Sequence, residues 1–230
     1  VTRWNSLLVF ISLLFSIPLA IVFGSLFFPE YEVWEHLRAT VLIDYIGNSF
    51  ALLIGVGFFS LLIGVIPAWL VTMYRFPLSR QLEWALLLPM SVPAYIIAYT
   101  YTGALDVAGP LQVTLREITG WQYRDYWFPE VRSLGGAIAM LSLVLYPYIY
   151  LLARAAFIEQ SVCVLEVSRT LGCNAFGGFR RVALPLARPA IMVGLSLVVM
   201  ETLADYGTVQ YFGVSTFTTG IFRTWFGLGN

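Results

Sequence analysis

Residues 50–74 read FALLIGVGFFSLLIGVIPAWLVTMY, a run of 25 residues without one charged side chain. An α-helix rises 1.5 Å per residue, so this run covers about 38 Å, more than the ~30 Å hydrocarbon core of a bilayer. The run is flanked by Asp44 on one side and Arg75 on the other. It therefore predicts a transmembrane helix, and the rest of the chain is interpreted from it.

Further apolar stretches of spanning length predict an all-α, polytopic membrane protein. With 50–74 they give about five spans in one transmembrane domain, residues 1–230: 7–28, 50–74, 84–105, 134–153 and 189–206. The first stretch is too long for the apolar region of a signal peptide and lacks a clear cleavage site. Prolines inside the spans predict kinks in the third and fourth, since proline removes a backbone donor: Pro67, Pro89, Pro93 and Pro147.

Composition supports the same class. The chain is 59% hydrophobic and only 11% charged, with a mean hydropathy of +0.81, whereas soluble domains are about 25% charged. These values exclude a soluble enzyme, a disordered chain and a nucleic-acid binder. All 13 basic residues are arginine, so no phosphate-binding loop of the lysine-containing kind is present. Cys163 and Cys173 indicate neither a disulfide framework nor a metal cage.

The arginines predict the orientation, because cytoplasmic loops are enriched in Lys and Arg. Eight of the 13 lie in the N-terminus, the 75–83 loop and the 154–188 loop: Arg3, Arg75, Arg80, Arg154, Arg169, Arg180, Arg181 and Arg188. We expect these segments and the N-terminus inside, and the 29–45 and 106–133 loops outside. The aromatic outer loop, with Trp121 and Trp127, fits either an interfacial belt or a docking surface for an external partner.

The 154–188 loop predicts a helix–turn–helix beneath the membrane. Residues 157–171 have apolar residues at helical spacing, and Gly172 follows where a helix C-terminal glycine is expected. Asn174 is a suitable N-cap for a second helix that Pro185 and Pro189 would end. Phe176 and Phe179 would form an exposed apolar knob. Such an element suits a groove on a cytoplasmic partner and equally an interfacial helix resting on lipid.

One segment of this loop carries a family resemblance. The stretch Glu166-Val167-Ser168-(x3)-Gly172-(x9)-Val182-Ala183-Leu184-Pro185 resembles the E-A-A-x3-G-x9-I-x-L-P loop of permeases in binding-protein-dependent ABC importers. The spacing matches throughout, with Val167 and Ser168 in place of two alanines and Val182 in place of isoleucine.

The resemblance implies a type I importer permease that binds no cofactor and is not itself an enzyme. The loop would dock into an ATP-binding cassette ATPase dimer, which holds ATP and Mg²⁺, through residues that include Phe176: Glu166, Ser168, Gly172, Phe176, Leu184 and Pro185. It also implies a bacterial inner-membrane location, a periplasmic binding protein as partner, and a second permease half in the same chain or another subunit.

Other stretches resemble the ferric-iron branch of these permeases. They are 76–77, 88–89, 93–95, 146–150, 154–157, 200–209 and 211–220. Members of that branch carry two homologous halves in one polypeptide, and this chain resembles the first half. The resemblance implies ferric iron as the substrate and a ferric-iron binding protein outside the membrane.

Glu201 and Asp205 lie inside the fifth expected span, four residues apart and hence on one helix face. A buried ionisable group costs about 2.5–3.5 kcal/mol there, so we expect the pair to line a substrate pathway and to bind Fe³⁺ transiently through its oxygens. Phenol oxygens could come from Tyr95, Tyr99, Tyr146 and Tyr148, of which Tyr146 and Tyr148 are further pathway candidates. The alternatives are a structural hydrogen bond for Glu201 and a capping role for Asp205.

Two other functions remain open at this point. A permease for another small solute has the same pattern, and an ion-coupled secondary carrier also uses embedded acids. A membrane enzyme lacks support, since the only histidine is His36 and no nucleophile–base arrangement is recognisable.

Overall fold

The computed structural model describes residues 2–25, 27, 31–122, 125–160, 162–170 and 172–228. Every regular element within these residues is a helix. The chain divides into two units, residues 1–43 and 44–230. Four helices are long and apolar enough to cross a membrane, and counting one bent helix pair as a span gives five. These residues therefore have the all-α architecture predicted for a polytopic membrane protein.

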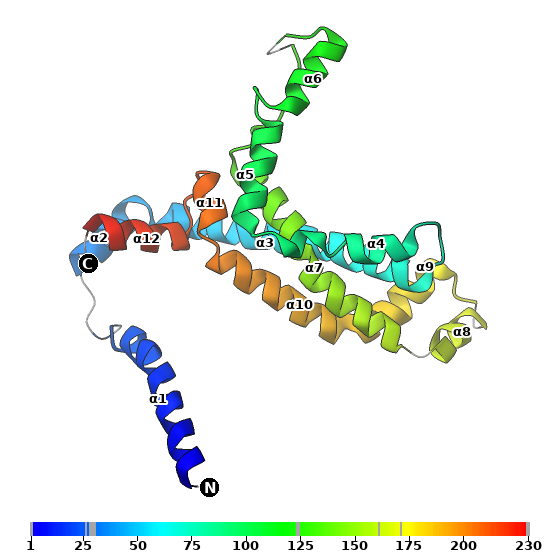
Figure 1. The fold of residues 1–230 in the computed structure, drawn as a ribbon, viewed down its shortest axis with the longest axis horizontal. Helices are drawn as coiled ribbons and strands as arrows, with labels where there is room; N and C mark the ends of the chain where they lie inside the picture. Colours follow the sequence, from blue (N-terminus) through cyan, green and yellow to red (C-terminus); the bar gives the residue numbers. More distant parts are fainter. Residues whose placement is uncertain are drawn as a thin grey trace. The chain divides into compact units, whose positions relative to one another are not determined.

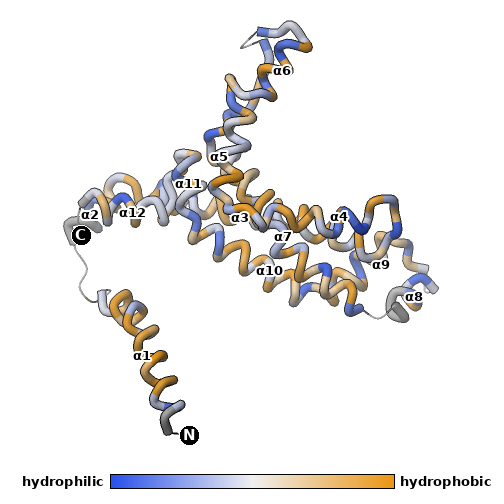
Figure 2. The backbone as a smooth tube through the Cα atoms, in the orientation of Figure 1, coloured by the Kyte–Doolittle hydropathy of each residue, from blue (hydrophilic) through white to orange (hydrophobic). Residues whose placement is uncertain are grey.

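The first unit consists of α1 (Thr2–Ser25) and the short α2 (Tyr31–Thr40). Hydrophobic residues follow each other along nearly all of α1 (Figure 2), and large side chains such as Phe10 and Phe15 are exposed. A helix that is apolar on all sides suits a lipid environment. The side chain of Arg3, one of the eight arginines expected on the cytoplasmic side, lies outside the described residues.

Three long helices form the body of the second unit: α3 (Leu42–Met73), α7 (Leu134–Glu159) and α10 (Leu184–Ala204). They lie side by side (Figure 1). Trp69, near the end of α3, contacts Phe157, near the end of α7, while Asn48, near the start of α3, bonds Ser215 beyond α10. Helices α3 and α7 thus run in one direction and α10 in the other, as alternating spans require.

Small residues let these three helices approach closely. Ile149 on α7 is fully buried between Gly64 on α3 and Gly194 on α10. A Cβ atom on Gly64 would lie 2.9 Å from the Ile149 Cβ, and one on Gly194 would lie 2.8 Å from the Ile149 Cα. Glycines at such contacts bring helix backbones together where no hydrophobic effect drives association, as in a bilayer.

The 84–105 stretch, expected as one span, is interrupted. It is divided among α4 (Ser79–Ala85), the 3₁₀ turn η1 (Leu88–Ser91) and α5 (Ala94–Leu105), and α6 (Pro110–Thr119) follows. The axis bends by 100° between Ser91 and Ala94, and α5 rises away from the three long helices (Figure 1). Pro93, whose missing N–H cannot continue a helix, lies at the bend. Helix α7, in contrast, continues through Pro147.

Polar contacts hold α4 and the residues after it against α7. The Tyr146 hydroxyl donates to the Leu86 carbonyl (2.8 Å), and the Tyr150 hydroxyl donates to the Glu83 carbonyl (3.2 Å). The Arg154 guanidinium pairs with the Glu83 carboxylate at 2.5 Å. The three α7 residues are spaced four apart, so they form one stripe along the helix. This stripe fixes α4 beside the bundle.

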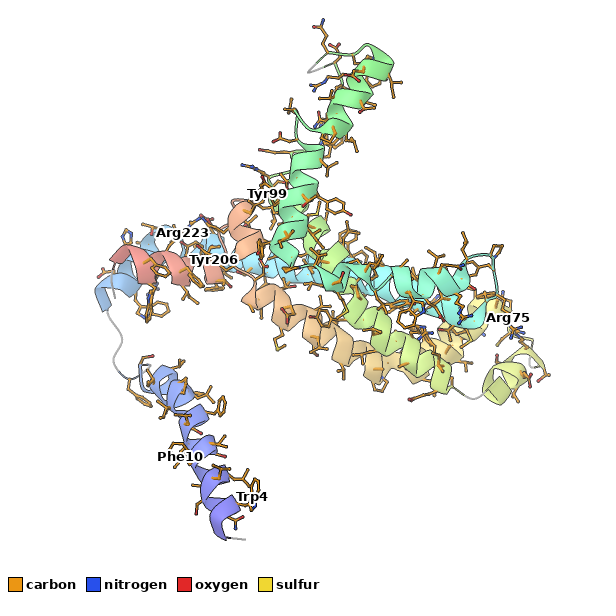
Figure 3. The ribbon with its side chains drawn as sticks, in the orientation of Figure 1. Trp4, Phe10, Arg75, Tyr99, Tyr206 and Arg223 are labelled. Carbon is orange, nitrogen blue, oxygen red and sulfur yellow. The ribbon has the colours of Figure 1, made fainter. Side chains whose placement is uncertain are left out.

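The chain beyond α10 folds back onto the start of α3 through α11 (Gly207–Tyr211) and α12 (Phe217–Leu228). The Asn48 side chain donates to the Ser215 carbonyl (2.9 Å), and the Ser49 hydroxyl accepts from the Phe217 backbone N–H (3.1 Å). Tyr206 stacks on Phe222 with ring centres 4.1 Å apart; Figure 3 labels Tyr206 beside α12. These contacts close the end of the bundle opposite Trp69 and Phe157.

Two adjacent glycines at the start of α7 provide a stability test. A Cβ on Gly136 would lie 1.9 Å from the Val131 carbonyl oxygen, whereas the nearest atom to a Cβ on Gly135 is the Ser133 Oγ at 3.8 Å. We expect Gly136→Ala to cost about 2–3 kcal/mol, since the N-cap formed by Ser133 must shift, and Gly135→Ala to be neutral or slightly stabilising. Thermal unfolding in detergent measures both, and equal unfolding temperatures would contradict the close contact.

Candidate functional site

The candidate site is the segment that joins α7 to α10, which we call the coupling element, residues 160–184. It contains α8 (Val162–Thr170), α9 (Ala175–Gly178) and the π-helical turn η2 (Phe179–Ala183). It lies at the end of the bundle where α3 and α7 finish (Figure 1). Hydrophilic residues are frequent in it, in contrast to the neighbouring long helices (Figure 2).

The single amphipathic helix expected over 157–171 is not formed. Helix α7 continues to Glu159, Gln160 adopts an extended backbone (ψ 130°), and α8 begins at Val162. Phe157 therefore belongs to the bundle, where it is 1% exposed. The prediction is wrong because Phe157 is buried against Trp69 of α3, and this packing extends α7 beyond Arg154, the expected end of the span. Leu171 and the side chain of Cys163 lie outside the described residues.

Gly172 ends α8 as predicted. Its φ of +84° is left-handed, a conformation that glycine adopts without a Cβ clash. The Cys173 N–H donates to the Ser168 carbonyl and the Gly172 N–H to the Arg169 carbonyl, both at 3.0 Å. These two bonds form the Schellman motif that satisfies the last carbonyls of a helix. The glycine in the resemblance thus has a defined role in the turn.

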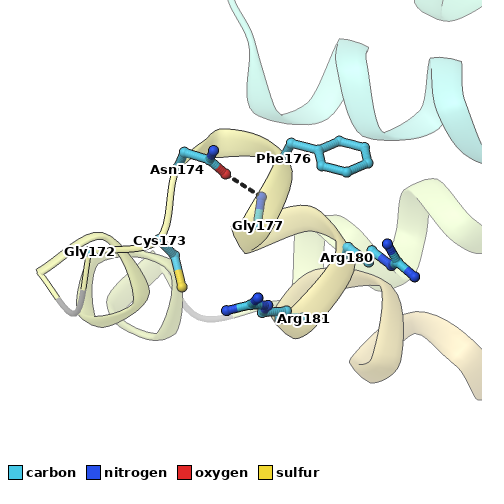
Figure 4. Close-up of a pocket in the computed structure, with 7 residues that line it drawn as sticks. All are labelled: Gly172, Cys173, Asn174, Phe176, Gly177, Arg180 and Arg181. Carbon is cyan, nitrogen blue, oxygen red and sulfur yellow. Dashed lines mark hydrogen bonds between the residues drawn. The ribbon is translucent and has the colours of Figure 1, made fainter.

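Asn174 caps the second helix, also as predicted, by accepting a hydrogen bond from the Gly177 N–H (2.7 Å; Figure 4). The expectation that Pro185 and Pro189 end this helix is wrong. Residues 175–204 form one helical stretch of spanning length. The Leu184 N–H donates to the Phe179 carbonyl five residues back, so a wider π turn precedes Pro185, which occupies the first turn of α10. At that position its missing N–H costs little.

The expected apolar knob divides into an exposed and a packed residue. Phe176 is 69% exposed. Phe179 instead packs against Trp69 and Phe157, with ring centres 5.1 and 6.4 Å apart, because η2 turns its ring toward the bundle. These three rings, the aromatic cluster, join the coupling element to α3 and α7.

The other predicted coupling residues take two kinds of position. Glu166 is exposed, while Leu184 and Pro185 are half-buried at the start of α10. Ser168 is buried, and a Cβ on Gly178 would lie 3.5 Å from its Oγ, so α8 packs on α9 there. An open hollow of about 750 Å³ borders the exposed side; Figure 4 shows the residues that line it, Gly172, Cys173, Asn174, Phe176, Gly177, Arg180 and Arg181.

Glu201 and Asp205, at the opposite end, do not share one helix. Helix α10 ends at Ala204, and Asp205 is extended (ψ 124°). The Asp205 carboxylate accepts hydrogen bonds from the Val209 N–H (3.0 Å) and the Thr208 hydroxyl (2.9 Å), so it caps the first turn of α11. Glu201 is exposed on the last turn of α10. The Asp205 backbone N–H still donates to the Glu201 carbonyl (2.9 Å), so Asp205 is the C-cap of α10 while its carboxylate caps α11.

The tyrosines named as pathway residues lie elsewhere. Tyr146 is buried and bonded to Leu86, and Tyr148 is half-buried on α7. Two other tyrosines approach α11, which follows Asp205. A Cβ on Gly207 would lie 3.3 Å from the Tyr95 Cβ, and the Tyr99 ring meets the Tyr211 ring edge-on at 5.9 Å; Figure 3 labels Tyr99. Within the described residues, no three His, Cys, Asp or Glu side chains gather closely enough to hold a metal ion.

Some polar residues at the coupling end were missed. Gln160 bonds the Ala183 carbonyl (2.9 Å), and Glu83 pairs with Arg154 across 71 positions of sequence. A single sequence offers no signal for such pairs, because their spacing follows from how the helices pack. In the 106–133 loop, which was expected outside, Trp121 stacks on Tyr126 and Trp127 is 86% exposed; these positions fit an interfacial belt and a docking surface equally. Tyr123 and Arg124 lie outside the described residues.

Comparison with known protein families shows the family to which this chain belongs. Residues 60–226, well over half of the chain, match the family described as "Binding-protein-dependent transport system inner membrane component". The chain belongs to this family. The match contains α7, α10 and the whole coupling element, so the resemblance to importer permeases is confirmed.

Relatives in this family carry different substrate names. The chain is 25% identical to "Fe(3+)-transport system permease protein FbpB 2" of Haemophilus influenzae over 225 residues, 96% of this chain and 39% of that protein. It is 28% identical to "Probable sulfate transport system permease protein cysT" of Chlorokybus atmophyticus over 175 residues, 74% and 55% of the two chains. It is 27% identical to "Molybdenum transport system permease protein ModB" of Escherichia coli over 154 residues, 67% and 64%.

The three relatives agree on the general role of the protein but not on its substrate. All three relatives are named as transport permeases, in line with a transport role and not an enzymatic one. Their identities to this chain are nearly equal, so they do not favour iron over sulfate or molybdenum. The chain spans between two-fifths and two-thirds of the length of these relatives.

Proposed function

We propose that this chain is a permease subunit of an ATP-driven importer in a bacterial inner membrane, with its N-terminus and coupling element on the cytoplasmic side. One observation carries the proposal: a family-matched coupling element exposes Phe176 and Glu166 while the aromatic cluster anchors it to the bundle. An exposed apolar side chain on a structurally fixed turn suits a groove on a partner.

In the proposed mechanism the chain supplies the path and a partner supplies the energy. ATP and Mg²⁺ bind to a separate pair of ATPase subunits, and closure of that pair moves the coupling element. Because Phe179 contacts both Trp69 and Phe157, this motion reaches α3 and α7 together. Such a device works only if the docking contacts differ between the two states of the transporter. A second permease half, in this chain or another, completes the pathway.

We propose ferric iron as the substrate, delivered by an external ferric-iron binding protein. Support comes from the carboxylates of Glu201 and Asp205 near the end of α10, since hard cations favour oxygen ligands. The iron-transport relative aligns with 96% of this chain, more than the sulfate and molybdenum relatives do. A permease for sulfate or molybdate is the second candidate, which those two relatives favour.

The proposal is tested in the complete transporter, reconstituted with its ATPase and binding protein in liposomes. Uptake of radiolabelled ferric iron, sulfate and molybdate is measured with ATP, without ATP, and with an imposed ion gradient instead. ATP-dependent iron uptake is expected. ATP-dependent uptake of sulfate or molybdate alone would reassign the substrate, and gradient-driven uptake without ATP would identify an ion-coupled carrier.

The two carboxylates are expected to differ in effect. Glu201→Gln removes a charge from an exposed side chain that makes no hydrogen bond to the described residues, and iron uptake should fall about tenfold while folding is unchanged. Asp205→Asn keeps one oxygen for the Val209 N–H, so its uptake loss should come with a stability loss below about 1 kcal/mol. Glu117→Gln, an exposed acid on α6, is the control. Wild-type uptake in both variants would exclude these carboxylates from the pathway.

A further inference from the structure

Gln160 lies where the coupling element leaves the bundle, and Ala183 lies where it returns. Helix α7 ends at Glu159, and Gln160 is the first residue with an extended backbone. Its side-chain Nε2 donates to the carbonyl of Ala183 (2.9 Å), which is fully buried and is the last residue of η2. One side chain thus joins both ends of the segment that carries α8 and α9.

Only one of the two polar atoms of the Gln160 amide has a hydrogen-bond partner among the residues that the structure describes. The Gln160 Oε1 is buried and accepts no hydrogen bond from the residues that the structure describes, and the Arg154 Nε is likewise buried and unpaired. A buried polar atom without a partner is unfavourable. The Gln160 amide is therefore held at this position by a single hydrogen bond, the one to the Ala183 carbonyl.

The Gln160–Ala183 bond lies at the end of an irregular helical turn, the π turn η2. The π turn η2 separates α9 from α10, and the Leu184 N–H bonds the Phe179 carbonyl across it. Turns of this type are rare, occur mostly as single turns inside α-helices and are frequent at functional sites. If no contact held this turn, α9 would be free to tilt relative to α10. The Gln160 amide bonds the end of the turn and so opposes that tilt.

We propose that Gln160 is a positioning residue that holds the coupling element to α7 and α10, so that ATPase motion moves the bundle instead of bending η2. This inference rests on the proposed importer function. The aromatic cluster connects the element to α3 and α7, and the Gln160 bond connects the two ends of the element to each other. Loss of the amide should therefore loosen the element without detaching it.

The test variant is Gln160→Met, which keeps a side chain of similar length and removes both the donor and the unpaired acceptor. Its neighbour Glu159→Met is the matched control, because the Glu159 side chain is exposed and forms no hydrogen bond or ion pair with the residues that the structure describes. In the reconstituted transporter, Gln160→Met should assemble with the ATPase and hydrolyse ATP at near wild-type rates. Substrate taken up per ATP hydrolysed should fall about fivefold, while Glu159→Met behaves as wild type.

A second measurement is independent of transport. Spin labels at the exposed positions Glu159 and Arg169, with Cys163 and Cys173 replaced by serine, report the distance between the end of α7 and α8. The proposal expects a broader distance distribution with Gln160→Met than with native Gln160.

The outcomes separate the inference from the function on which it rests. Unchanged uptake per ATP with an unchanged distance distribution would overturn the positioning role. Failure of Gln160→Met to assemble, with an equal loss of hydrolysis and uptake, would show a structural role and would also overturn it. If the wild-type transporter shows no ATP-dependent uptake, the importer function itself is contradicted. The spin-label distances then still test whether Gln160 holds the coupling element in place.

Discussion

Replacing Gly64 or Gly194 by leucine is expected to destabilise the three-helix body by about 3 kcal/mol per site, at the upper end of overpacking costs. The two glycines contact opposite sides of Ile149, where an added Cβ would lie within 3 Å of that residue. Part of the obstacle is backbone, namely the Ile149 Cα and the Tyr146 and Tyr148 carbonyls, which no change of rotamer can move. Thermal unfolding in detergent should show a fall of roughly 6–12 °C.

The control for these variants is a glycine on α3, the helix that carries Gly64. A Cβ on Gly47 in α3 has no atom within 4 Å, so Gly47→Leu tests the effect of leucine on the helix without a packing clash. Ile149→Ala, which opens space beside Gly194, should partly restore Gly194→Leu and make the double variant more stable than the two single changes predict. Equal unfolding temperatures for Gly47→Leu and Gly194→Leu would refute the close packing.

Replacing Phe176 by aspartate is expected to weaken binding of the partner ATPase about 100-fold, as loss of a central aromatic contact typically costs 2–4 kcal/mol. Phe176 is 69% exposed at the start of α9, so its removal leaves no cavity. An acidic residue in the first turn of a helix is favourable, so α9 should persist in the variant. Affinity of the purified ATPase for the chain in lipid nanodiscs measures the effect.

A matched substitution separates docking from a general effect of added charge. Ile118 on α6 is 80% exposed, and Ile118→Asp adds the same charge far from the coupling element. We expect this variant to bind the ATPase as wild type does. If Phe176→Asp also retains wild-type affinity, the surface around Phe176 is not the docking face.

Local signals in the coupling element were readable from the sequence. Gly172 marks the end of α8, and Asn174 marks the start of α9, because a left-handed glycine and an N-cap act on backbone within a few residues. The extents of the helices were less readable. Helix α7 continues to Glu159, and the helix from Ala175 passes Pro185 without ending, because packing of Phe157 and a π turn outweigh local preferences.

In the candidate site, too, some features follow from the sequence and others only from the folded structure. The exposed Phe176 follows from the pattern, whereas the packing of Phe179 on Trp69 depends on which way η2 turns. Glu201 and Asp205 are visible as acids in an apolar stretch. Only the folded chain shows that the Asp205 carboxylate accepts from the Val209 N–H and caps the next helix, since its spacing from Glu201 fits a continuous helix equally well.

The sequence by itself determined the membrane class, the all-α fold and the position of the coupling element. Each of these depends on composition or on residues near one another in the chain, such as the uncharged run 50–74. The tertiary structure alone decided that Gly64 and Gly194 enclose Ile149, that Glu83 pairs with Arg154, and that Gln160 closes the coupling element. These pairs arise from the distances and rotations at which helices pack, and a single sequence does not encode those as a local pattern.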